Sequence, residues 1–158
     1  MNKKAMMIIS RLEEEISELR RIVERVKKAW SSAEKSSDEL YLDSVALNLH
    51  GFYSCIERLF ELIARNIDES IPAGENWHQE LLRQMVTEIK LVRPAVLSRD
   101  TYDRLDEYRG FRHVVRNVYT FNLSLKKLKP LVEDIDCVFS AVSNEIKKFI
   151  EYINANAK

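Results

Sequence analysis

The sequence predicts an all-α fold, an antiparallel bundle of four to five helices, on three observations. The chain of 158 residues holds only three glycines and three prolines, which is too few for a fold rich in turns and strands. Charged residues make up 32% of the chain, as is typical of long amphipathic helices. Apolar residues recur at spacings of three and four, the pattern of a helix with one buried face. We expect a single domain over residues 1–158, because a chain of this length can bury a core of its own.

The first half of the chain predicts two long helices. The first is expected over residues 6–35 and the second over residues 38–66, with a break and a capping residue at Ser36-Ser37-Asp38. Two adjacent helices with a short connection form an antiparallel hairpin. The expected inward positions are Leu12, Ile16, Leu19, Val23, Val26 and Trp30 in the first helix, and Val45, Leu49, Phe52, Ile56, Leu59 and Ile63 in the second.

The second half predicts three more helices. The third is expected over residues 77–92, where Arg93-Pro94 ends it, and the fourth over residues 100–119. The fifth is expected over residues 125–154, or from a few residues later, because Pro130 falls near its start. The expected inward positions are Leu81, Leu82, Met85, Val86 and Ile89 in the third helix, and Leu128, Leu131, Ile135, Val138, Val142, Ile146, Phe149 and Ile153 in the fifth.

Charge and cysteine usage exclude several classes of protein. The 25 basic residues balance the 25 acidic ones, so nucleic-acid binding must come from a local patch. Cys55 and Cys137 each lie in an apolar helical pattern, and we expect both to be buried reduced thiols. No signal peptide is visible and no apolar run reaches the roughly 18 residues of a membrane span, so we expect a cytoplasmic protein. Without a glycine-rich phosphate loop, no dinucleotide cofactor is expected.

Residues 108–119 hold the densest group of candidate functional side chains. No acidic residue occurs from 108 to 132, although the whole chain is charge-balanced. On a helix, residues three, four and seven apart share a face. The sequence therefore predicts one stripe of Arg109, Arg112, Arg116 and Tyr119, with His113 and Asn117 on its flank.

A basic stripe that contains a proton-transfer residue suits a partner that carries phosphate, and RNA fits best. Metal-free cleavage of RNA uses the neighbouring 2′-hydroxyl as nucleophile. It needs a group that moves a proton and cations that stabilise the charged phosphorus centre. The imidazole of His113 and the guanidinium of Arg112 suit these two roles. The alternative is a solvated basic face whose arginines pair with glutamates of neighbouring helices.

Residues 111–116 resemble the motif helix of the HepT-like branch of the HEPN superfamily, the ribonuclease toxins of prokaryotic toxin–antitoxin pairs. The signature of these toxins is R-x-x-x-x-H-x-Y, and Arg112 and Tyr119 match its first and last positions. Residues 74–82 and 119–123 are also similar to that branch. The resemblance implies a HEPN-like bundle, a homodimer with a shared cleft, and metal-independent endoribonuclease activity. It also implies a nucleotidyltransferase antitoxin that adenylylates Tyr119. The alternative for Tyr119 is a partly buried side chain at the end of its helix.

The chain departs from this signature at Asn117, which stands at the histidine position. Asparagine forms hydrogen bonds but carries no proton near pH 7. One interpretation assigns the proton transfer to His113, one helical turn away, with Arg112 on the phosphate and Arg109 and Arg116 as RNA-binding cations. A second leaves Arg112 to act while Asn117 orients the substrate. A third is an inactive helical module that binds a nucleotidyltransferase partner, so whether the chain is an enzyme stays open.

The other two histidines are interpreted as structural. His78 follows Trp77 at the expected start of the third helix, and His50 lies between Leu49 and Gly51 inside the second. We expect no metal site at His78, because a bound metal needs more ligands at suitable spacing. The sequence thus predicts a packed helix start at His78 and a helix interface at His50.

Overall fold

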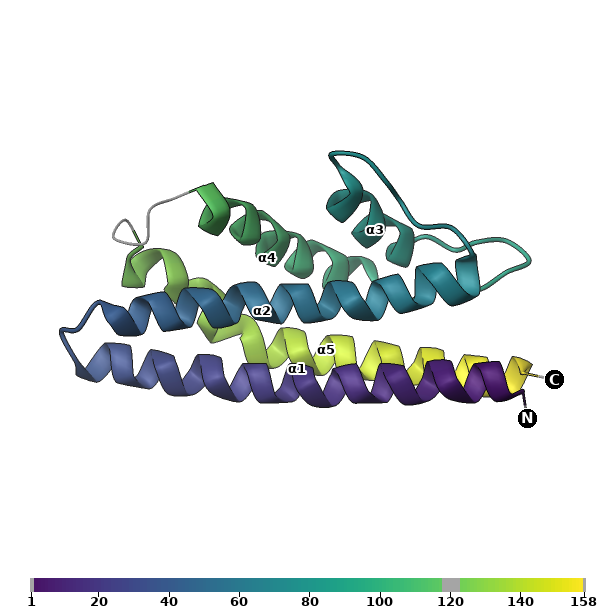
Figure 1. Cartoon of the computed structure of the whole chain (residues 1–158), viewed down its shortest axis with the longest axis horizontal. Coiled ribbons are helices and arrows are strands. Elements are labelled where there is room, and N and C mark those ends of the chain that lie inside the picture. The colour runs from purple at the N-terminus through teal and green to yellow at the C-terminus, as the bar shows by residue number, and fades with distance from the viewer. Residues whose placement is uncertain (1, 118–122, 158) are drawn as a thin grey trace.

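The computed structural model describes residues 2–117 and 123–157 as a bundle of helices (Figure 1). Within these residues there are five α-helices and no strand, which confirms the predicted all-α bundle. The helices are α1 (Lys3–Lys35), α2 (Leu40–Ile63), α3 (Trp77–Val86), α4 (Arg99–Asn117) and α5 (Leu125–Asn156), and a π-helical turn, η1 (Ala64–Asp68), continues α2.

Three long helices form the body of the bundle. Figure 1 shows α1 and α2 as an antiparallel hairpin with α5 along it, and both chain ends lie at the same end of α1. The predicted inward positions of α1 and α2 are buried, except that Trp30 is only half-buried. The hairpin turn is capped by Asp38, whose Oδ1 accepts a hydrogen bond of 3.0 Å from the backbone N–H of Leu40. Burial of these apolar faces provides the driving force for the bundle.

Helix α3 ends earlier than its apolar spacing predicts. It stops at Val86, and the expectation of a helix to residue 92 was wrong. The side chain of Arg93 turns inward and donates hydrogen bonds to the backbone carbonyls of Thr87 and Gln84, at 3.0 and 3.1 Å. These bonds satisfy carbonyls that a longer helix would have used itself. Ile89, an expected core position, is only half-buried as a result.

Helix α4 lies across α2 and is fixed to α5 at its start and at its middle. At its start, Glu145 of α5 accepts hydrogen bonds from the backbone N–H of Ser98 and the hydroxyl of Thr101. Further along, the buried hydroxyl of Tyr108 donates to the carbonyl of Leu131 over 2.7 Å. A buried hydroxyl costs free energy unless it is hydrogen-bonded, so this contact favours one placement of α4.

Helix α5 begins at Leu125, at the early end of the predicted range, and includes Pro130 near its start. All eight of its predicted inward positions are buried. Both cysteines are free thiols, but only Cys55 is buried, so the expectation of a buried Cys137 was wrong. Cys137 lies beside the inward Val138 and therefore points about 100° away from it around the helix axis. No helix in the described part of the chain is long and apolar enough to cross a membrane.

Candidate functional site

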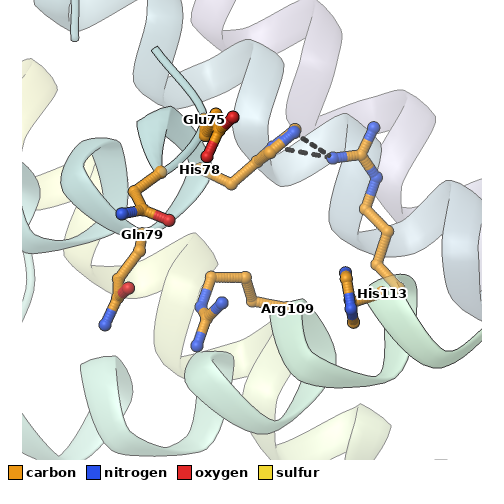
Figure 2. A pocket seen from close by; sticks show the side chains of 7 residues that line it. Glu75, His78, Gln79, Arg109 and His113 are labelled. Atoms are coloured by element: carbon orange, nitrogen blue, oxygen red, sulfur yellow. Dashed lines mark hydrogen bonds between the residues drawn. The ribbon is translucent and has the colours of Figure 1, made fainter. Parts of the chain in front are cut away.

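A pocket of about 310 Å³ opens between the start of α3 and the second half of α4. Two arginines and two histidines are among the side chains that surround it, and Figure 2 shows them together with the acidic and amide side chains of the loop before α3. The pocket is lined by Glu75, Asn76, His78, Gln79, Arg109, Arg112 and His113.

Helices α2 and α4 supply the wall behind the pocket. His50, Tyr53 and Glu57 are three, four and seven residues apart in α2, so they share one helical face. Helix α4 is held against that face by Tyr108, whose ring lies 5.2 Å from the ring of Phe52 between centroids. The packing of the two helices therefore brings polar side chains of α2 to the arginines of α4.

Arg112 is the centre of this polar group. Its Nη1 lies 3.1 Å from Oε1 of Glu57 and 3.0 Å from Nε2 of His78. Its Nε donates to Nε2 of His50 over 3.3 Å. The side chain of Arg112 is 17% exposed and that of Glu57 is 5% exposed. The guanidinium is therefore held between α2 and α3 at the edge of the pocket.

Glu57 is a buried carboxyl with two partners, the guanidinium of Arg112 and the imidazole of His78. Burial raises its pKa above the ordinary value of a glutamate, and the hydrogen bond from His78 and the charge of Arg112 pull that pKa back down. The Nδ1 of His78 lies 2.6 Å from Oε2 of Glu57. These contacts hold the carboxylate in the site as a counter-charge to Arg112.

A second arginine lines the pocket, and a buried tyrosine of α2 lies close enough to feel the charge of both arginines. Nε of Arg109 donates to Oδ1 of Asp106 over 2.7 Å, within α4. Tyr53 is fully buried, and its hydroxyl has no hydrogen-bond partner among the described residues. Burial raises the pKa of Tyr53 strongly, and the charge of Glu57 raises it further. Tyr53 is therefore a neutral hydroxyl under the arginines.

The structure brings three of the six predicted site residues to one pocket. Arg109, Arg112 and His113 all line it. The side chains of Arg116 and Asn117, in the last turn of α4, lie outside the described part of the chain, as does the whole of Tyr119. Arg109 and Arg112 are both ion-paired. Although residues 108–132 contain no acidic side chain, carboxylates from outside this segment, Asp106 and Glu57, neutralise part of the stripe.

Three residues that the sequence analysis did not assign to the site contact Arg112, namely His50, Glu57 and His78. His78 does lie in the first turn of α3 and pack against Trp77, with 3.5 Å between ring centroids, but its Nδ1 also lies 2.6 Å from Glu57. One signal was available: His50 and Glu57 are polar residues seven apart on a helix whose inward face is otherwise apolar. That spacing identifies a polar position inside the bundle, but it does not identify the partner.

Comparison with known protein families assigns this chain to one of them. A family model described as HepT-like protein matches residues 44–153, which is more than half of the chain and includes every side chain of the pocket. The comparison with curated proteins and the comparison with solved structures give no match. The match spans α2 to α5, so it includes the segment whose residues resemble the motif helix. The chain belongs to the HepT-like family of the HEPN superfamily.

Proposed function

We propose that this protein is a metal-independent RNA endonuclease, the toxin of a toxin–antitoxin pair. The observation that supports this proposal best is the pocket that combines Arg109 and Arg112 with His78 and His113. Guanidinium groups bind phosphate oxygens in two-point contacts, and imidazoles transfer protons near neutral pH. The family match agrees with this activity, because the activity is the one that the HepT-like resemblance implies.

In the proposed reaction, Arg112 binds the phosphate that is cleaved and stabilises its developing negative charge. The phosphate competes with Glu57 for the N–H groups of Arg112. Glu57 retains a partner during this exchange, because its other oxygen lies 2.6 Å from Nδ1 of His78. His113 or Asn117 contacts the reacting ribose and phosphate, and Arg109 with Arg116 binds the flanking RNA backbone.

The proposal includes regulation and assembly. Two copies of the chain would place two motif helices around one groove and double the number of cations that face RNA. A partner nucleotidyltransferase would adenylylate Tyr119. The added phosphate would carry negative charge to the end of α4, where it would occupy the arginines that bind RNA.

The first test is cleavage of RNA without metal. Purified protein is expected to cut a mixed-sequence RNA in a buffer that contains EDTA, and added Mg²⁺ is expected to leave the initial rate nearly unchanged. The physical reason is that arginine side chains take the charge-stabilising role that a metal has in other nucleases. The measurement is the initial rate on a labelled RNA in gels. Cleavage that appears only with Mg²⁺ would overturn the proposal.

A second candidate function is an inactive HEPN module that binds a nucleotidyltransferase. It is favoured by Asn117 at the signature histidine position and by the ion pairs that Glu57 and Asp106 form with Arg112 and Arg109.

The variant Asn117→His separates the two functions. If the parent protein does not cleave RNA and Asn117→His does, the module is the correct assignment. If the parent cleaves RNA and the rate changes by less than about 10-fold in Asn117→His, proton transfer comes from elsewhere in the site and the enzyme is the correct assignment. Initial rates in EDTA on one RNA give both results.

A further inference from the structure

His78 is held more firmly than an exposed histidine at a helix start. Its side chain is 23% exposed, and its Nδ1 lies 2.6 Å from Oε2 of Glu57, whose side chain is 5% exposed. The neighbouring ring of Trp77 contacts it in a tilted arrangement, with 3.5 Å between ring centroids. A carboxylate that accepts a proton from one ring nitrogen fixes both the tautomer and the orientation of the imidazole.

The contact with Glu57 decides what the other ring nitrogen can do. A carboxylate only accepts hydrogen bonds, so Nδ1 carries a proton, and in the neutral imidazole the lone pair is then on Nε2. Nη1 of Arg112 lies 2.7 Å from Nδ1 and 3.0 Å from Nε2. Nη1 is thus nearly equidistant from the two ring nitrogens and lies beside the ring, away from the direction in which the lone pair of Nε2 points. The imidazole of His78 therefore lies next to the guanidinium that would bind the phosphate, and Figure 2 shows His78 at the pocket.

On the basis of the proposed RNA cleavage, we infer that His78 is the general base of the reaction and that Glu57 is its positioning residue. The phosphate takes the N–H groups of Arg112 and thereby comes to lie next to the imidazole of His78. Nε2 then accepts the proton of the 2′-hydroxyl, and the 2′-oxygen forms a bond to phosphorus. The bond from phosphorus to the 5′-oxygen breaks, and that oxygen takes a proton from the imidazolium of His113. The products are a 2′,3′-cyclic phosphate and a 5′-hydroxyl, and exchange with water resets both histidines.

The placement of the two histidines supports this division of roles. Both line the pocket, and they come from different helices, α3 and α4. An in-line displacement needs a base for the attacking oxygen and an acid for the leaving oxygen, and two histidines from different helices can supply both. This assignment also explains how the chain could cleave RNA with Asn117 at the signature histidine position. The proton would be accepted by His78 of α3, so no histidine is needed at position 117.

The test uses two kinds of substrate in EDTA. One is a labelled RNA, and the other is the set of four nucleoside 3′-(4-nitrophenyl) phosphates, whose leaving group departs without a proton. His78→Ala is expected to slow both by about 10²–10⁴-fold, the usual contribution of a general base. His113→Ala is expected to slow only the RNA reaction. The matched control is Arg83→Ala, an exposed side chain of α3, which should leave both rates unchanged.

The outcomes separate this inference from the proposed function. If Arg112→Ala abolishes cleavage while His78→Ala retains it on both substrates, the general base is wrong and the nuclease stands. If the parent protein cleaves neither substrate in EDTA, the proposed nuclease activity and the role of His78 as general base are both wrong. Circular dichroism and thermal melting of each variant confirm that a lost rate is not a lost fold.

Glu57→Gln tests the positioning role. The turnover number is expected to fall by about 10-fold or more, as for other partners that orient a histidine. In ¹H–¹⁵N spectra of the parent, His78 should show the tautomer with the proton on Nδ1, and Glu57→Gln should show a mixture of tautomers. A parent spectrum with the proton on Nε2 would contradict the inference.

Discussion

Replacement of Arg112 by alanine is expected to abolish measurable RNA cleavage. Loss of one donor to a developing anion lowers the turnover number by about 10²–10³-fold, and Arg112 supplies more than one donor. Glu57 keeps a hydrogen bond from His78 at 2.6 Å in this variant, and thermal melting followed by circular dichroism checks that the fold persists. Initial rates on a labelled RNA in EDTA measure the effect.

The matched control for this variant is Arg99→Ala. Arg99 lies in the first turn of the same helix, its side chain is 75% exposed, and it pairs with Asp103. Its loss should change the rate by less than about twofold, because an exposed ion pair contributes little. Equal losses in the two variants would show that general positive charge, rather than a site at Arg112, controls cleavage.

The largest loss of stability is expected from Arg93→Ala. Arg93 and Asp68 form a fully buried ion pair, with both side chains 0% exposed, and the contacts are 2.5 Å from Nε to Oδ1 and 2.7 Å from Nη2 to Oδ2. Removal of the arginine leaves a buried carboxylate without its cation, which costs about 3–5 kcal/mol of unfolding free energy. Urea denaturation followed by circular dichroism measures the loss.

Two further variants show whether that loss comes from the unpaired charge. Lys129→Ala removes an exposed pair with Glu133, with side chains 60% and 62% exposed, and should cost less than about 1 kcal/mol. The double variant Asp68→Leu with Arg93→Met removes both charges and should be more stable than Arg93→Ala. A double variant that is less stable than Arg93→Ala would contradict this explanation.

The long helices could be predicted because local spacing determines which of their residues are buried. In α2, for example, Phe52, Ile56 and Leu59 recur at spacings of four and three and are all fully buried. The end of α3 could not be predicted in this way. The apolar spacing continues to Ile89, but the side chain of Arg93 binds the backbone carbonyls at the end of α3. Arg93 is held there by Asp68, which lies 25 residues earlier, so spacing within one helix does not reveal this contact.

The candidate site was predictable only within one helix. The spacing of Arg109, Arg112 and His113 along α4 predicted that they lie together, and they line one pocket. Glu57 and His78 reach Arg112 from α2 and α3, and no spacing within one helix reveals how two others pack against it. The sequence therefore predicted the arginine and missed the two side chains that orient it.

The most direct test of the proposed mechanism is the chemistry of the RNA ends after incubation in EDTA. Attack by the 2′-hydroxyl leaves a 2′,3′-cyclic phosphate on one product and a 5′-hydroxyl on the other, and mass spectrometry of the fragments identifies both. We expect these ends with the parent protein and no fragments with Arg112→Ala. Fragments with 3′-hydroxyl and 5′-phosphate ends, or cyclic ends that persist in Arg112→Ala, would contradict the mechanism.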